Sequence, residues 1–245
     1  MLNQQIPMKA DHDGSSTLLV HSIFGTIQGE GIFAGEPCVF IRLGGCNLQC
    51  PACDTEYTNG AKLMTVDTIL DRVFKHKPPK TDLVVITGGE PMRQRIGLLI
   101  SVLNESGLRV QIETNGTLYD GSINFGTGKV FVMCSPKTGS VNPMLKKHIT
   151  AYKYVGGANE NDLLETVGLQ DHSLMVDGLP KQALGHTAKP YLARPHEGFK
   201  GKVYLQPIDR QNELLNAYHT QAVVESCLEN GYTLCLQMHK IVNVE

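Results

Sequence analysis

The stretch Gly44-Gly45-Cys46-Asn47-Leu48-Gln49-Cys50-Pro51-Ala52-Cys53 places three thiols on one short loop, at intervals of four and three residues. Cysteines this close together can turn inward onto one cubic iron-sulfur cluster. Such a cube is usually held by four thiolates, so a loop with three leaves one iron with an open coordination position. The same cysteines with a distant histidine could instead form a closed tetrahedral zinc site, and the spacing alone leaves both possibilities open.

The residues before this cysteine loop (residues 46–53) read as a buried strand. The apolar run Val39-Phe40-Ile41-Arg42-Leu43 ends at the glycine pair that precedes the first thiol. Catalytic loops of barrel-like folds leave the ends of buried strands in this way. The sequence therefore predicts that the cysteine loop lies at the functional edge of the fold.

The totals of the chain limit its class. The 245 residues can bury one sizeable core, so we expect a single domain over residues 17–245. With 22 basic and 24 acidic residues the net charge is -2, which disfavours nucleic-acid binding because that function ordinarily needs a basic patch. The expected ligand is therefore a small molecule.

The chain shows no membrane signal. No stretch approaches the ~20 apolar residues of a membrane span, so we expect no membrane association and a cytoplasmic location. The seven cysteines then read as thiols rather than disulfides. Residues 1–16 are polar and aperiodic and predict a mobile leader, whereas residues 184–202 predict a long loop that serves as a lid or a subunit contact.

Alternation of apolar and polar residues predicts strands around residues 39–43, 108–113, 203–206 and 234–239, each with polar side chains on one face. Helical periodicity predicts helices around residues 66–74, 96–103 and 212–228. The last of these is expected to turn Leu214, Leu215, Tyr218 and Ala222 inward. Strands interleaved with helices favour parallel pairing. The fold class predicted is α/β, an open, partial TIM-like barrel of parallel strands with outer helices.

Polar groups follow several of these strands. Thr87-Gly88-Gly89-Glu90-Pro91 offers exposed backbone and one carboxylate that could hold an amino-acid-like ligand. Near the start of the chain, Gln28 and Glu30 lie between glycines and could bind a polar ring. One such end alone is more often an ordinary turn, but several in one chain favour a shared site.

Taken in order, the motifs of the chain resemble the 7-carboxy-7-deazaguanine synthase family of radical S-adenosylmethionine enzymes, from about Ile23 onward and apart from residues 139–202. The motifs are Gln28-Gly29-Glu30-Gly31, Arg42, the cysteine loop with Asp54-Thr55, Thr87-Gly88-Gly89-Glu90-Pro91, Glu113-Thr114-Asn115-Gly116, Ser135-Pro136-Lys137, Gln206-Pro207-Ile208-Asp209 and Gln237-Met238-His239-Lys240. The cysteine loop and the Gly-Gly-Glu-Pro turn mark the superfamily at large. The Gln-Gly-Glu-Gly opening, the Asp-Thr pair and the closing Gln-x-His-Lys narrow the resemblance to this family.

The resemblance implies a reaction. In that family a 4Fe-4S cluster passes one electron to S-adenosylmethionine, and the resulting 5'-deoxyadenosyl radical abstracts hydrogen from C6 of 6-carboxy-5,6,7,8-tetrahydropterin. Ring contraction and loss of ammonia then give 7-carboxy-7-deazaguanine for queuosine-type biosynthesis. The cofactor carries the hard chemistry, while the protein positions and shields it.

The resemblance also implies site residues. Cys46, Cys50 and Cys53 would bind the cluster, and Thr55 would help to bind Mg²⁺. The residues implied in binding S-adenosylmethionine are Ala52, Gly89, Glu90, Ser135, Pro136, Lys137, Gln206, Pro207, Ile208 and Asp209. Those implied in binding the pterin are Ile27, Gln28, Gly29, Glu30, Arg42, Thr87 and Glu245, with Arg42 suited to the carboxylate of the substrate. Ala52 departs from the aromatic residue that many relatives carry there, so cofactor contact at this position would rest on backbone.

Further partners and two alternatives follow. The family implies a homodimer and a flavodoxin-like or similar electron donor. A radical activase that makes a glycyl radical on a partner protein would share the cysteine spacing, but Arg42 with Gln28 and Glu30 favours a small carboxylated heterocycle. A zinc-stapled binding module without catalysis is the alternative from a different class.

Overall fold

The computed structural model describes residues 4–13, 16–50, 53–158, 175–176, 179–180 and 192–244. Its strands are β1 (Thr17–Ile27), β2 (Pro37–Leu43), β3 (Lys62–Thr65), β4 (Leu83–Gly88), β5 (Arg109–Thr114), β6 (Val130–Cys134), β7 (Ile149–Gly156), β8 (Met175–Val176), β9 (Leu179–Pro180), β10 (Lys202–Pro207) and β11 (Thr233–Leu234). Its α-helices are α1 (Val66–His76), α2 (Gly97–Glu105), α3 (Pro143–Lys146), α5 (Glu213–Asn230) and α6 (Met238–Ile241), and its 3-10 helices are η1 (Gly31–Phe33), η2 (Pro91–Arg93) and η3 (Phe125–Thr127).

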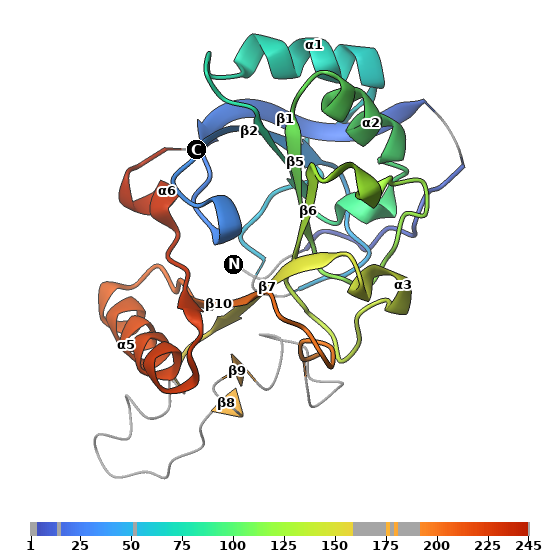
Figure 1. The fold of residues 1–245 in the computed structure, drawn as a ribbon. Coiled ribbons are helices and arrows are strands. Elements are labelled where there is room, and N and C mark those ends of the chain that lie inside the picture. The colour runs from blue at the N-terminus through green and yellow to red at the C-terminus, as the bar shows by residue number, and fades with distance from the viewer. Residues whose placement is uncertain are drawn as a thin grey trace, which may run out of the picture.

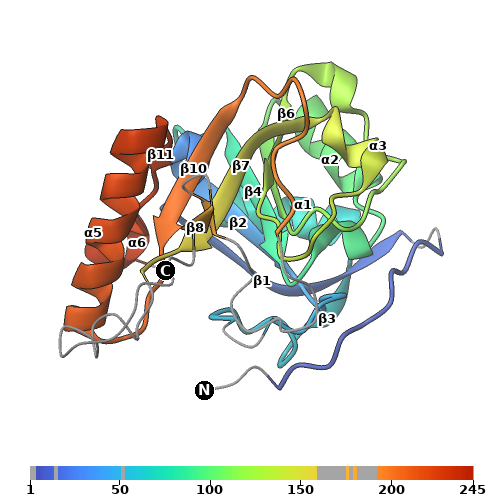
Figure 2. The same ribbon diagram turned by 90° about the horizontal axis from the view of Figure 1, so that it is seen from below.

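Nine of the described strands form one curved, open sheet. The order is β11-β10-β7-β6-β5-β4-β2-β1-β3, and β8 and β9 form a separate antiparallel pair. From β11 to β2 all neighbouring strands are parallel, whereas β1 and β3 are added antiparallel at one end. Figures 1 and 2 show the sheet curving, with α1 and α2 outside it and α5 beside β10. The predicted open, partial barrel of the α/β class is confirmed.

The outer face of the sheet carries the core. Alternate residues of β2, β4 and β5 are completely buried in one cluster with the inward stripes of α1 and α2. Helix α1 begins after Thr65, whose side chain accepts a hydrogen bond from Thr68 N at 3.2 Å, and it buries Val66, Ile69 and Val73. A capped start and an apolar stripe at helical spacing are what an outer helix of a barrel needs.

Helix α5 has the predicted position but presents a different face. Asn212 caps its first turn, and Gly231 ends it at a φ of 70°. Its buried residues are His219, Val223, Ser226 and Cys227, while Leu214 is 77% exposed. The predicted inward position of Leu214 is therefore wrong, whereas Leu215, Tyr218 and Ala222 are half-buried. The helix packs on the sheet through a mixed polar and apolar stripe, which apolar periodicity alone does not reveal.

The inner face of the sheet changes character along the strands. Near the starts of β2 and β4 it is apolar, with Cys38, Leu83 and Val85 packed against Phe33 and Phe40. Toward the strand ends the same face is polar, as described below. The barrel is thus plugged at one end and polar at the other, where the loops after parallel strands gather.

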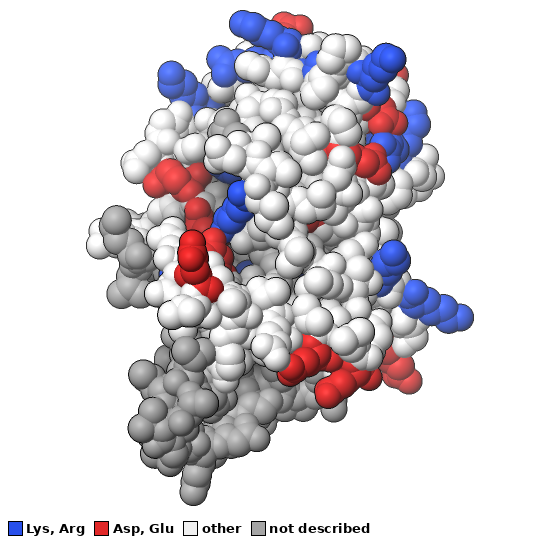
Figure 3. Space-filling model, turned by 90° about the vertical axis from the view of Figure 1, so that its left-hand side faces the viewer, with Lys and Arg blue, Asp and Glu red and all other residues white. Residues whose placement is uncertain are grey.

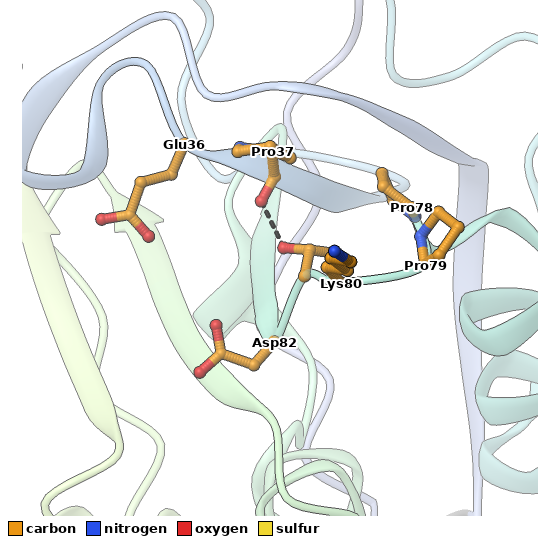
Figure 4. Close-up of a pocket in the computed structure, with 7 residues that line it drawn as sticks. Glu36, Pro37, Pro78, Pro79, Lys80 and Asp82 are labelled. Atoms are coloured by element: carbon orange, nitrogen blue, oxygen red, sulfur yellow. Dashed lines mark hydrogen bonds between the residues drawn. The ribbon is translucent and has the colours of Figure 1, made fainter.

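A pocket opens at the plugged end, away from the cysteine loop. It has a volume of about 440 Å³ and is lined by Pro37, Pro78 and Pro79, with Glu36 and Asp82 at its rim (Figure 4). Both carboxylates bind Arg109, at 2.8 Å from Glu36 and 2.7 Å from Asp82. Because its two carboxylates are already paired with Arg109 and it lies at the amino ends of β2 and β4, we do not regard this pocket as the active site.

Truncation of a buried residue in β5 tests this packing. Ile112 has no exposed surface, so Ile112→Ala is expected to lower the free energy of unfolding by about 2–5 kcal/mol. Leu98→Ala removes a side chain of similar size that is 55% exposed on α2, and it should change the free energy by less than about 0.5 kcal/mol. Urea denaturation of cluster-free protein measures both variants. Equal losses would contradict the assignment of the core.

Candidate active site at the carboxyl ends of the parallel strands

Parallel pairing brings most of the predicted site residues to one edge of the sheet. The exceptions are residues 27–30, because β1 is antiparallel and Ile27 pairs with Pro37 at the start of β2. Gln28 and Glu30 therefore come from the opposite edge and contact Glu113 and Lys153 on the inner face. Arg42 near the end of β2 lies beside Thr87 of β4, and Gly156 at the end of β7 lies beside Pro207 of β10. Thr114 and Cys134 pair at the ends of β5 and β6. The cysteine loop, the Gly-Gly-Glu-Pro turn and the segments around Ser135 and Gln206 therefore all leave the sheet at this edge.

The cysteine loop has a chemically suitable donor set. Leu48 N donates to Cys46 Sγ at 3.4 Å, and Cys53 N donates to Cys50 O at 3.1 Å, so backbone bonds shape the loop. Burial raises the pKa of the Cys46 thiol to about 12 and also raises the pKa of Cys50 and Cys53, while the nearby Lys137 ammonium opposes the shift at these two. Thiols in such a setting become anionic when a cation binds them.

Single-metal sites and clusters place different demands on this loop. Among the residues that the structure describes, no three His, Cys, Asp or Glu side chains are arranged to hold a metal ion. A cube-shaped cluster takes each thiolate at a different corner, so its ligands need not converge on one point. The fit of the loop to a 4Fe-4S cluster rests on its three thiols and on the backbone N–H directed at Cys46 sulfur.

Two glycine pairs bring the cysteine loop and the Gly-Gly-Glu-Pro turn into contact. Gly88 has a φ of 142°, and a Cβ there would lie 2.1 Å from Leu43 O. A Cβ on Gly89 would lie 2.3 Å from Gly45 O and 2.7 Å from Cys46 Cβ. Glu90 N donates to Gly45 O at 3.0 Å. Only glycine allows the two backbones this approach.

Glu90 is fully buried and has three donors. Its carboxylate accepts from Thr114 Oγ1 at 2.8 Å, from Met92 N at 3.0 Å and from Asn115 N at 2.8 Å. Burial outweighs these bonds and raises the pKa of Glu90 to about 7. In this structure the carboxylate joins the loops that follow β4 and β5, a role that the motif alone did not suggest.

Arg42 presents a buried donor without a partner. Its guanidinium lies over the Phe24 ring, 5.4 Å from the centroid, and its Nε is buried without a hydrogen-bond partner among the described residues. An unsatisfied donor on a cation is costly unless a ligand accepts from it. Its place beside Thr87 on the inner face of the sheet therefore fits an anionic group of a ligand.

The other predicted S-adenosylmethionine residues lie after β6 and at the end of β10. Ser135, Pro136 and Lys137 follow β6. Gln206 and Pro207 end β10, and Ile208 and Asp209 follow it. Lys137 Nζ donates to Ser135 Oγ at 2.5 Å, and burial lowers the pKa of Lys137. Asp209 binds Lys240 at 2.6 Å, which with backbone and amide donors lowers the pKa of Asp209 to about 2. Lys240 also lies 4.0 Å from Asp54, so the segment after β11 reaches the cysteine loop.

The C-terminal segment closes over the Gln-Gly-Glu-Gly motif. Met238 N donates to Gly29 O at 3.1 Å, and a Cβ on Gly29 would lie 2.0 Å from His239 Nδ1. On the face occupied by α5 and α6, Figure 3 shows acidic side chains around a basic one beside a hollow.

Several site residues were missed by sequence reasoning. The main one is Lys153 of β7, which is 7% exposed and forms ion pairs with Glu30 and Glu113. The signal that could have revealed it is a lone charge in the apolar strand sequence Tyr152-Lys153-Tyr154. Gln111 and Gln237 join the same network through hydrogen bonds to Glu113 and Glu30.

The segment before β1 ties down both ends of the cysteine loop. Met8 N donates to Cys46 O at 2.7 Å, and Gln5 Nε2 donates to Thr55 O at 2.9 Å. Arg93 Nη1 donates to Lys9 O at 3.1 Å, which links this segment to η2. The predicted mobility of residues 1–16 stays a prediction, but residues 4–13 have defined contacts here.

Comparison with known proteins identifies the family. Residues 40–165 match the family model described as the radical SAM superfamily. The 7-carboxy-7-deazaguanine synthase of Rhodospirillum rubrum is 39% identical over 95% of this chain and 94% of its own length, and that of Rickettsia prowazekii is 39% identical over 98% and 94%. The chain belongs to the 7-carboxy-7-deazaguanine synthase family. Its fold is also that of QueE from Escherichia coli, whose crystal structure matches with a TM-score of 0.64 at 24% identity, over 91% of this chain and 95% of that one.

Membership of this radical S-adenosylmethionine family confirms the predicted resemblance, and it implies the 4Fe-4S cluster and S-adenosylmethionine as cofactors. It favours the ring-contracting synthase over the activase and the zinc-stapled module. Ala52, Glu245 and residues 184–191 of the predicted lid lie outside the described residues. No helix in the described part of the chain is long and apolar enough to cross a membrane.

The shifted pKa of Glu90 gives a test of the site in this family member. Between pH 4.5 and about 7 the folded state keeps a proton that the unfolded state releases, so the carboxyl group makes the protein less stable as pH rises through this window. Glutamine does not titrate. The stability advantage of the wild type over Glu90→Gln should therefore shrink between pH 4.5 and 8, by up to about 3 kcal/mol.

Denaturant titrations of cluster-free protein at several pH values measure this difference. Glu105→Gln, which removes an exposed carboxylate from α2, serves as the matched control. An advantage that grows with pH would contradict the assignment, since it would mean that the three donors outweigh burial.

Proposed function

We propose that this protein converts 6-carboxy-5,6,7,8-tetrahydropterin to 7-carboxy-7-deazaguanine with loss of ammonia, as a radical S-adenosylmethionine lyase. The main support for this function is the 39% sequence identity to two 7-carboxy-7-deazaguanine synthases over nearly the whole chain. The three-thiol loop packed against the Gly-Gly-Glu-Pro turn supports it, because the loop offers the thiols that such a reaction needs.

When bound, the cluster and S-adenosylmethionine supply the radical that abstracts hydrogen from C6 of the pterin. In this proposal Cys46, Cys50 and Cys53 hold the cluster. Residues 4–13 and the glycine pairs keep these thiols in place, through the bonds of Met8 and Gln5 to the ends of the loop.

Residues around the loop would hold S-adenosylmethionine. The proposed set is Ala52, Gly89, Glu90, Ser135, Pro136, Lys137, Gln206, Pro207, Ile208 and Asp209. Lys137 supports it because its buried ammonium lies close enough to Cys50 to affect the pKa of that thiol. Glu90 would contribute by fixing the turn, since its carboxylate is bound within the protein.

The pterin would lie on the inner face of the sheet, against Ile27, Gln28, Gly29, Glu30, Arg42 and Thr87. Arg42 would bind the substrate carboxylate with its guanidinium, whose Nε has no partner among the described residues. Gln28 is 1% exposed, so this region can exclude water from a bound ring.

The remaining partners are part of the same proposal. Thr55 would take part in Mg²⁺ binding, and its hydroxyl already lies 3.2 Å from the Asp54 carboxylate, a hard oxygen ligand of the kind Mg²⁺ prefers. A homodimer that brings Glu245 to the substrate, a flavodoxin-like electron donor and a cytoplasmic location stay predictions.

Product analysis tests the function. Anaerobic enzyme with carboxypterin, S-adenosylmethionine, reductant and Mg²⁺ is expected to yield 7-carboxy-7-deazaguanine and ammonia. If S-adenosylmethionine were cleaved without forming a deazapurine, the proposal would fail and the activase would gain support.

Substitution of Arg42 tests most directly whether this residue binds the carboxylate of the substrate. Arg42→Ala should lower kcat/KM for the carboxypterin by about tenfold to a hundredfold, because a charge-assisted bond to the substrate is lost, while iron content stays at the wild-type level. Arg42→Lys keeps the charge but loses the bidentate geometry, so an intermediate effect is expected. Arg72→Ala, at an exposed position of α1, is the control. Parallel loss of iron and turnover in Arg42→Ala would show a structural role.

A further inference from the structure

Lys153 is a buried cation at the centre of the inner face. It lies in the middle of β7, its side chain is 9% exposed, and its ammonium forms an ion pair with Glu30 and lies 3.8 Å from Glu113 Oε2. Burying a charge is expensive unless it is paired, so two carboxylates around one ammonium need an explanation.

Amide side chains fix the two carboxylates further. Gln237 Nε2 donates to Glu30 Oε1 at 2.9 Å. Gln28 and Gln111 both donate to Glu113 Oε1, at 3.0 Å and 2.9 Å. These residues come from β5, the C-terminal segment and the loop after β1, and Glu30 and Glu113, both ion-paired to Lys153, connect them.

One acceptor in this network is unused. Gln111 Oε1 is buried and has no hydrogen-bond partner among the described residues. Among the residues that the structure describes, Glu113 Oε2 has only the 3.8 Å contact to Lys153 Nζ. The network thus has two carboxylates for one ammonium, and it also has an amide oxygen without a donor. These acceptors suit a ligand that donates N–H hydrogen bonds. The 2-amino-4-oxopyrimidine edge of a pterin is such a ligand.

The charges around Glu30 decide its ionisation. Burial acts to raise the pKa of Glu30, but Lys153 of β7, helped by Gln237 and His239, holds it below its ordinary value. Glu113 and the Cys235 thiol also face Lys153, and its carboxylate partners raise the pKa of Lys153 above its ordinary value. Lys137 is a further cation near the network.

We propose that Lys153 is a positioning residue of the substrate site, which fixes Glu30 as an anionic acceptor, beside Glu113, for the N–H donors of the bound heterocycle. This inference rests on the proposed function. Lys153 touches neither substrate nor cofactor in this account and acts through Glu30. A purely structural ion pair would stabilise the fold without affecting ligand binding.

The test uses cluster-loaded enzyme and the product 7-carboxy-7-deazaguanine as an air-stable probe that keeps the pyrimidine edge. Calorimetry gives its Kd between pH 6.5 and 8.5 for wild type, Lys153→Met and Lys153→Arg, with Lys75→Met at an exposed position of α1 as the matched control. Iron content and thermal unfolding are measured for each variant.

Lys153→Met is expected to weaken binding by about tenfold or more at pH 6.5, because the buried Glu30 then takes up a proton and loses its acceptor role. The defect should shrink as pH rises and Glu30 ionises. Lys153→Arg should stay within about threefold of wild type, and iron content should not change. A wild-type to variant Kd ratio near one at every pH, or a defect that does not change with pH, would overturn the inference.

A second comparison covers the case in which Lys153→Met fails to fold. Glu30→Gln with Lys153→Met removes both charges, which buried pairs often tolerate. If Lys153 acts through Glu30, adding Lys153→Met to Glu30→Gln should weaken binding by less than about threefold. A further tenfold loss would overturn the inference. Wild-type enzyme that neither binds the product nor converts the carboxypterin would instead refute the proposed function itself.

Discussion

The close approach of two glycine pairs is the constraint on which the rest of this structure depends. Gly44-Gly45 directly precedes the cysteine loop, and Gly88-Gly89 joins β4 to the loop that follows it. Any Cβ at Gly88 or Gly89 would overlap the backbone of the facing segment. The pairing of β2 with β4 sets these loops side by side, and Glu90 then bonds the second of them to the loop after β5. Backbone contacts therefore hold the start of the cysteine loop, at Gly45 and Cys46, against the turn after β4.

The inner face of the sheet has an apolar part, which contributes to stability, and a charged part, which can bind a ligand. At the starts of β2 and β4 it is filled by apolar side chains around Val85, and further along the strands it holds Arg42, Glu113 and Lys153. Burying charged groups costs free energy that the core on the outer face must offset, and ion pairs and amide bonds reduce this cost. A polar interior at the carboxyl ends of parallel strands is suited to hold a polar ring away from water.

Much of the fold could be predicted from the sequence because it depends on local pattern. The run from Val39 to Leu43 became β2, and the polar positions Gln111 and Glu113 face inward as their alternation indicates. Predictions failed where tertiary contacts decide. Residues 234–239 read as one strand, but β11 ends at Leu234 and α6 begins at Met238, because the segment turns to bind Gly29.

Candidate site residues were identified from the sequence where they form a motif. Residues that are far apart in the chain and come into contact only in the folded structure were missed. Spacing and residue type alone single out the cysteine loop and Arg42 as candidates, whereas Lys153 has no motif and is recognised only by its ion pair with Glu30, which is far away in the chain. The contacts of Met8 and Gln5 with the cysteine loop likewise have no pattern in the sequence.

The proposed function depends on a 4Fe-4S cluster that only three protein thiolates hold, those of Cys46, Cys50 and Cys53, so that one iron keeps an open coordination position. Electron paramagnetic resonance of the anaerobically reconstituted, reduced protein, with and without S-adenosylmethionine, tests it most directly when combined with iron analysis. The account predicts about four irons per chain and a cluster signal that changes when S-adenosylmethionine binds the open iron. A colourless zinc protein, or a cluster signal that S-adenosylmethionine leaves unchanged because a fourth side chain occupies that iron, would contradict it.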